Sequence, residues 1–161
     1  MADKELIQEK IGEALGLERA AQKAVELLDS RGLLKQEHTT KLSKMKNEAN
    51  KQEQEMENIV EDLTKTDELD SSMIEQMAAE TAEKASKIME TYLGENPDTQ
   101  EALEFLCLAE GGEVIHYEVL NSIAKEIKNK KFGTVVRLIL KEEKRHLDLC
   151  TQLAKRNTAS E

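Results

Sequence analysis

Proline, glycine and aromatic residues are scarce in this sequence. Its 161 residues include one proline, seven glycines, two tyrosines, two phenylalanines and no tryptophan, while 35% of the residues are charged. Sheets and barrels need turn residues at short intervals and strands rich in aromatic and β-branched side chains. The composition therefore argues against a β-rich fold and predicts an all-α protein built from long helices.

Long apolar runs and paired cysteines are also lacking. No run approaches the length of about 18 apolar residues that indicates a membrane-spanning helix, and the N-terminal segment is charged from Asp3 onward, unlike a signal peptide. The two cysteines form neither a disulfide framework nor a CxxC pair. We therefore expect a cytoplasmic protein with reduced thiols.

The formal net charge is −10. Such a charge argues against binding to the phosphate backbone of nucleic acids and to anionic membrane surfaces. The length fits one domain, 1–161, which is large enough to bury a core. We expect a single domain without a nucleic-acid or membrane partner.

Helical periodicity and turn signals divide the chain into five helices. Gly32 lies in the turn after the first helix, and Pro97 lies in the connection that ends the third. The predicted helices cover residues 4–29, 34–63, 73–93, 100–128 and 132–154. We expect the first two and the last two to form antiparallel hairpins, joined by the crossover helix 73–93 into an antiparallel four-helix bundle.

One face of the last predicted helix carries two polar residues where apolar ones are expected. At steps of four and three, this face presents Phe132, Val136, Ile139, Glu143, His146, Cys150 and Leu153. A buried carboxylate is costly unless it is paired or bound to a metal. Glu143-x-x-His146 points both side chains to the same side, which is the spacing of ligands in di-metal carboxylate bundles.

The other predicted helices place carboxylates at the same level. Glu18 interrupts the apolar face of the first helix, and Glu113, followed by His116, interrupts that of the fourth. Glu48 lies beside the apolar face of the second helix. The same number of residues separates Glu18 from Glu48 and Glu113 from Glu143, so we expect each pair to face each other within its hairpin.

Neighbouring residues compete for some of these positions. Glu110 competes with Glu113, and Gln52 or Glu55 competes with Glu48. Four converging carboxylates would repel one another and take up protons unless cations neutralised them. The predicted metal ligands are Glu18, Glu48, Glu113, His116, Glu143 and His146.

This set of residues resembles that of the ferritin-like superfamily, with rubrerythrin-type domains and the small ferritin-like stress proteins most similar in layout. The most similar part is the last hairpin. There, Glu113 is followed by Leu-x-x-Ile-Ala-Lys-Glu and then by Glu142-Glu143-x-x-His146 with Leu147.

The first hairpin departs from the superfamily pattern. Where the superfamily has a second Glu-x-x-His, this chain has Glu48-Ala-Asn-Lys51. His116 is expected to supply the missing imidazole from the fourth helix. The chain also lacks the CxxC pairs of a rubredoxin module, which excludes a complete electron-shuttling rubrerythrin.

The resemblance implies a ferritin-like bundle that binds two iron ions, or manganese, with zinc as a substitute in isolated protein. It further implies oxidation of the bound metal by O2 or peroxide, a role in iron handling or oxidative-stress defence, and a homodimer. A function of another class stays open: a metal-poor helical bundle that serves as a dimerisation or interaction module without enzymatic activity.

Overall fold

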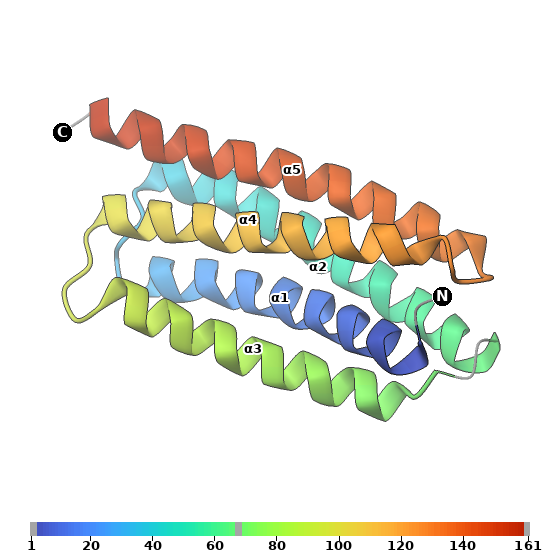
Figure 1. Ribbon diagram of the computed structural model, residues 1–161. Helices are drawn as coiled ribbons and strands as arrows, with labels where there is room; N and C mark the ends of the chain where they lie inside the picture. The colour runs from blue at the N-terminus through green and yellow to red at the C-terminus, as the bar shows by residue number, and fades with distance from the viewer. Residues whose placement is uncertain (1–2, 67–68, 160–161) are drawn as a thin grey trace.

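The computed structural model describes residues 3–66 and 69–159, which form five α-helices and, within these ranges, no β-strand (Figure 1). The helices are α1 (Lys4–Ser30), α2 (Gln36–Thr66), α3 (Ser71–Leu93), α4 (Thr99–Ala124) and α5 (Lys130–Ala159). The predicted all-α class is thus confirmed. Asp3, Asp70 and Asp98 cap α1, α3 and α4 by accepting hydrogen bonds from backbone N–H groups of the first turn. In the described part of the chain, no helix has the length and apolarity needed to cross a bilayer.

The last hairpin has different helix ends from those predicted. α4 ends at Ala124 instead of 128, because the chain tightens there and the Ile127 N–H donates to the Ala124 carbonyl at 3.1 Å. α5 continues to Ala159 instead of ending at 154. Asn157 is 1% exposed and donates to Gln100 Oε1 at 2.8 Å, so contacts with α4 hold the last turns of α5 in place.

Four of the helices, α1, α2, α4 and α5, lie side by side as a bundle (Figure 1). α1 and α5 run in one direction, and α2 and α4 run in the other. α3 runs parallel to α1, packs along its outer side and spans the length of the bundle between the end of α2 and the start of α4. The last helix of the sequence therefore packs against α4 and α2, with α1 on the opposite side of the bundle axis.

The core of the bundle has an apolar cluster at each end and a polar layer between them. One apolar cluster includes Ile11, Leu63, Leu120, Phe132 and Ile139. The other includes Leu28, Leu42, Leu103, Cys150 and Leu153. The buried polar residues of the middle layer are Glu18, Gln52, Glu110, Glu113, Glu143 and His146. Because apolar side chains enclose this layer on both ends, its charges lie in a medium of low dielectric constant.

Two glycines of α1 allow α3 to pack unusually close. A Cβ atom at Gly16 would lie 2.5 Å from the carbonyl oxygen of Ala78, and one at Gly12 would lie 2.8 Å from the carbonyl oxygen of Ile74. Each glycine inside a helix costs about 1 kcal/mol relative to alanine. The close packing of the α1 and α3 backbones accounts for glycine at both positions.

We expect Gly16→Ala to lower the free energy of unfolding by about 1–3 kcal/mol, because the α3 backbone would have to move away. The matched control is Gly133→Ala in α5, where the new Cβ would approach only the end of the flexible Arg137 side chain, at 3.2 Å. That variant should be neutral or stabilising by up to about 1 kcal/mol. Urea unfolding of both variants makes the comparison, and equal destabilisation would contradict the close approach of α1 and α3.

Candidate metal centre

The polar layer gathers side chains from four helices. α1 contributes Glu18, α2 contributes Gln52, α4 contributes Glu110 and Glu113, and α5 contributes Glu143 and His146. Each of these side chains is at most 6% exposed, and Glu18 and Glu143 are fully buried. Each is positioned by a helix whose neighbouring turns are anchored in the two apolar clusters, so the layer is held by rigid elements.

Two groups of three residues in this layer have the geometry of metal ligands. One group is Glu18, Glu113 and Glu143, and the other is Glu110, Glu143 and His146. Within each group, one ligand atom per residue lies within 4.8 Å of the others. Glu143 belongs to both groups, so a single carboxylate with two oxygens could bridge two cations. This sharing of Glu143 makes the layer suitable for a pair of ions.

Most of these side chains also have buried polar atoms that lack a hydrogen-bond partner among the described residues. They are Glu18 Oε2, Glu110 Oε2, Glu113 Oε1, Tyr117 Oη, Glu143 Oε2 and His146 Nδ1. Leaving a buried polar atom unpaired costs about 1–3 kcal/mol, and more for charged groups. Six such atoms in one layer are far more than packing alone explains, since buried polar atoms are almost always satisfied. Four of the six are carboxyl oxygens and one is an imidazole nitrogen, and these donor types fit a divalent cation; the sixth is the hydroxyl of the neighbouring Tyr117.

The charges of the layer are unevenly distributed in the absence of metal. Burial raises the pKa of Glu18, Glu110 and Glu113 well above that of an ordinary glutamate, and nearby carboxylates raise it further. Burial also acts to raise the pKa of Glu143, but the adjacent His146 and the close carboxyl groups of Glu110 and Glu18 outweigh it and lower this pKa. The layer therefore concentrates negative charge on Glu143 and keeps protons on the other carboxyls.

His146 and Gln52 are hydrogen-bond donors of the layer: His146 can carry a positive charge, and Gln52 is neutral. Burial acts to lower the pKa of His146, yet the neighbouring Glu143 and Glu48 raise it overall. With its amide nitrogen turned toward the carboxylates, Gln52 donates to Glu143 Oε1 at 2.6 Å and to Glu18 Oε1 at 3.3 Å. Gln52 thus leaves the second oxygen of each carboxylate free for another partner.

The structure brings together four of the residues predicted from the sequence, namely Glu18, Glu113, Glu143 and His146. His116, in contrast, lies apart from this layer. It is 37% exposed, its Nδ1 lies 2.8 Å from the carbonyl oxygen of Gly112, and its Nε2 lies 3.5 Å from Glu13 on α1. The prediction that His116 supplies an imidazole to the site is therefore not supported by its position.

The position of His116 follows from the rotation of α4 about its axis. The buried face of α4 passes through Leu106, Glu110, Glu113, Tyr117 and Leu120, whereas the predicted face included His116. A carboxylate at 110 therefore occupies the interior in place of the imidazole. The sequence did not decide whether Glu110 or Glu113 faces the interior, and in the structure both are buried in the layer.

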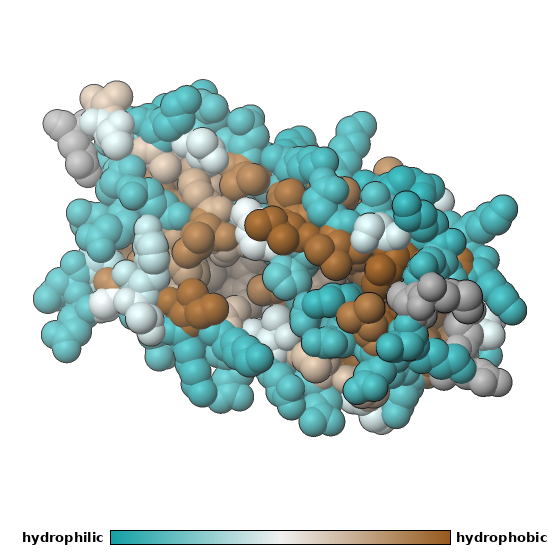
Figure 2. Space-filling view, viewed as in Figure 1, coloured by the Kyte–Doolittle hydropathy of each residue, from teal (hydrophilic) through white to brown (hydrophobic). Residues whose placement is uncertain are grey.

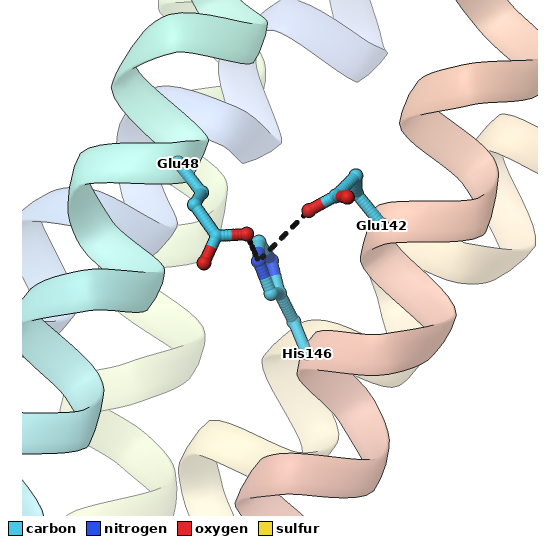
Figure 3. Close-up of side chains that lie close together, drawn as sticks. All are labelled: Glu48, Glu142 and His146. Atoms are coloured by element: carbon cyan, nitrogen blue, oxygen red, sulfur yellow. Dashed lines mark hydrogen bonds and ion pairs between the residues drawn. The ribbon is translucent and has the colours of Figure 1, made fainter.

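Glu48 also lies outside the buried layer, in a second cluster nearer to the surface. Its Oε2 lies 3.5 Å from His146 Nε2, and Glu142 Oε2 lies 3.9 Å from the same nitrogen (Figure 3). Glu48, Glu142 and His146 form a third group with the geometry of metal ligands. The guanidinium of Arg145 lies between the two carboxylates, and its Nη2 contacts both Glu48 and Glu142. We call Glu48, Glu142 and His146 the outer cluster, and the two groups around Glu143 the inner cluster.

Tyr117 and Glu142 were not among the predicted site residues. Tyr117 is fully buried, and its hydroxyl faces Glu18. Its position one turn after Glu113 on a helix would have indicated that it points into the same layer. Glu142 precedes Glu143, and no periodicity distinguishes it from a solvated carboxylate.

Comparisons of the chain with models of protein families, with curated proteins and with solved structures gave no match.

Proposed function

We propose that this protein is a non-haem di-metal carboxylate protein of the ferritin-like type, which binds two iron or manganese ions and oxidises them with O2 or peroxide. The observation that carries this proposal is Glu143, a buried carboxylate shared by two groups of ligand geometry. The unpaired atoms of the same layer support it, because bound cations would satisfy them together.

The charge balance of the inner cluster agrees with two divalent ions. Glu18, Glu110, Glu113 and Glu143 carry four negative charges when all are ionised, which two divalent cations neutralise. Without cations, four charges in a buried layer would repel one another strongly, and three of these carboxyls hold on to their protons instead. Oxygen-rich ligands with one imidazole suit Fe²⁺ and Mn²⁺ better than softer ions that prefer thiolates.

The arrangement of the helices supports the ferritin-like part of the proposal. In di-metal bundles of this type, two helices each provide a glutamate and the other two each provide a Glu-x-x-His pair. Here α1 provides Glu18 and α5 provides Glu143 with His146. α2 lacks its pair, and α4 compensates by providing Glu110 and Glu113, which are three residues apart and both buried.

The bound metal would supply the redox chemistry with O2 or peroxide. The residues of the chain hold the ligand geometry, exclude bulk water and accept or release protons. Tyr117 lies beside Glu18 with its hydroxyl in the buried layer. Iron handling or defence against oxidative stress is the role that this chemistry would serve.

Metal content tests the proposal directly. Protein stripped with a chelator and reloaded anaerobically with Fe²⁺ or Mn²⁺ should hold about two ions per chain. Glu143→Ala should lose both ions because Glu143 serves both groups. Glu118→Ala is the matched control, since Glu118 is half exposed on α4 and pairs with Lys144 instead of facing the layer. Elemental analysis by mass spectrometry gives the measurement.

Wild-type protein without bound metal, or equal metal content in wild type and Glu143→Ala, would overturn the proposal. Either result would favour the second candidate function, a dimerisation module without enzymatic activity. That candidate is supported by an apolar groove of about 840 Å³ between α1, α3 and α4, with exposed Leu27, Ile88 and Leu108 along it. Figure 2 shows apolar side chains around this hollow.

A second copy of the chain is the partner that this groove would take. Leu108 and Ile115 are 53% and 63% exposed and lie at equal distances on either side of the Gly111-Gly112 pair of α4. A two-fold axis at the glycines would set Leu108 of one copy against Ile115 of the other. A homodimer of this kind is compatible with either candidate function, so metal content, and not the oligomeric state, separates the two.

A further inference from the structure

The outer cluster lies between solvent and the inner cluster. The exposed fraction of the side chains falls from 41% for Glu142 to 23% for Glu48 and 1% for His146. Beyond His146 comes Glu143, which is fully buried. Glu142 and His146 lie within one turn of α5, and Glu48 faces them from α2 (Figure 3). The series therefore leads from the surface toward the candidate metal centre.

His146 connects the two clusters through its two ring nitrogens. Nε2 faces Glu48 and Glu142, whereas Nδ1 lies 3.8 Å from Glu143 Oε2 and has no hydrogen-bond partner among the described residues. The side chain is almost completely buried, yet its polar atoms are aimed at carboxylates on both sides. Such an imidazole can serve as a ligand on either side.

The other inner carboxylates offer no comparable access. Glu18, Glu110 and Glu113 are each at most 2% exposed. The apolar clusters close the layer along the bundle axis. Of the groups with ligand geometry in the described chain, the outer cluster has the most solvent-exposed members.

A cationic group already lies at the outer cluster. Arg145 Nη2 contacts both Glu48 and Glu142, of which Glu48 is the less exposed. Arg145 itself is 52% exposed, so it can swing into solvent without disturbing the core. A guanidinium held by two carboxylates marks a position where positive charge is stabilised.

We infer that Glu48, Glu142 and His146 form an outer binding site for a divalent cation, through which metal ions reach the inner cluster, and that Arg145 occupies this site until an ion displaces it. The inference rests on the proposed function of the inner cluster. A cation binds the two carboxylates and His146 Nε2 as Arg145 leaves, and then moves inward to Glu143. Arg145 returns and closes the surface. No bond is made or broken other than those to the metal ion.

Stopped-flow uptake of Co²⁺ by chelator-treated full-length protein tests the inference, because the visible absorption of Co²⁺ reports its coordination. Glu142→Gln should slow uptake about tenfold, the lower limit of the effect of charged residues on association rates. The final absorption of the inner cluster should stay at the wild-type level. Arg145→Gln should speed uptake severalfold, because the competing cation is gone.

Glu118→Gln and Lys144→Gln are the matched controls, since these two exposed residues pair with each other at 2.8 Å and their substitution makes the same changes of charge. Both should load at the wild-type rate to within about twofold. If Glu118→Gln slowed uptake as much as Glu142→Gln, the slowing would come from the weaker general attraction of cations to the protein. That result would overturn the outer site. The outer site is also overturned if Glu142→Gln loads at the wild-type rate or loses the inner absorption. If wild-type protein takes up no Co²⁺, the proposed function itself fails.

Discussion

Replacing Glu113 with methionine is expected to stabilise the metal-free protein and to abolish binding at the group that Glu113 forms with Glu18 and Glu143. Glu113 is 2% exposed, and its Oε1 has no partner among the described residues. Methionine has a similar length and no polar atoms, so it fills the same space without the cost of a buried carboxyl. An unpaired buried polar group costs about 1–3 kcal/mol, and we expect a gain in this range.

The sign of this change separates a metal centre from a structural network. If Glu113 contributed hydrogen bonds that the fold needs, methionine would leave its partners unpaired and would destabilise the protein by about 1–3 kcal/mol. Leu120→Ala on the same helix provides the reference for a purely structural loss. Leu120 is fully buried, and its truncation should cost about 2–5 kcal/mol.

Urea unfolding with a chelator and with excess Mn²⁺ measures both parts of the prediction. A ligand present at 100 times its dissociation constant stabilises the folded state by about 2.7 kcal/mol. Wild type and Leu120→Ala should both gain stability with Mn²⁺, whereas Glu113→Met should gain much less. A Glu113→Met protein that is less stable than wild type in chelator would contradict the assignment of this residue to a metal site.

The sequence predicted the α5 part of the site well because α5 has one clearly apolar face. Glu143 and His146 interrupt a regular series that begins at Phe132 and ends at Leu153, and both are buried in the structure. Glu18 was found in α1 by the same argument. In both helices the opposite face is charged, so the periodicity identifies only one face that can be buried.

The rotation of α4 could not be predicted in the same way. Leu108, Ile115 and Val119 are apolar yet 53%, 63% and 40% exposed. Apolar residues therefore surround this helix on more than one side, and the spacing alone cannot distinguish the face that packs against α1 and α5. The prediction of His116 as a ligand came from this ambiguity, and the packing of neighbouring helices resolves it.

The difficulty with α2 has a different origin. This helix is so rich in charged residues that a glutamate near its apolar face carries little information. The structure buries Gln52 and leaves Glu48 at the edge, 23% exposed. A rotation of α2 by a small angle would exchange their positions, and that angle depends on the side chains of α1 and α5 across the interface. The helical fold was predictable from local periodicity, whereas the burial of each α2 side chain was not.

Metal-free protein is expected to lose stability as the pH rises from about 5 to 8, the reverse of ordinary acid denaturation. The pKa values of Glu18, Glu110 and Glu113 are raised by burial in the folded state. The unfolded chain releases these protons near the ordinary pKa of 4.5, so above this value the folded state binds more protons. Each retained proton then lowers the stability by about 1.4 kcal/mol per pH unit until the folded group titrates.

The histidine and the remaining glutamate of the layer do not change this sign. The pKa of His146 is raised above its ordinary value of 6.5, so its contribution is present below that value and is lost as the pH rises through its folded pKa. The pKa of Glu143 is lowered, and its contribution is lost only when the pH falls below the ordinary pKa of a glutamate. That loss therefore occurs below the range of about pH 5 to 8 over which the metal-free protein is expected to lose stability.

Bound metal should reverse the trend, because a cation displaces the protons of its ligands and binds more tightly as the pH rises. Urea unfolding at pH 5, 6.5 and 8, with chelator or with excess Mn²⁺, therefore should give slopes of opposite sign. Glu110→Gln should make the slope in chelator less steep by the share of one proton, because an amide cannot release a proton, whereas Glu118→Gln at the surface should leave it unchanged. If chelator-treated protein were more stable at pH 8 than at pH 5, the layer would already be ionised and compensated by the protein itself. Its carboxylates would then have no need of a metal ion.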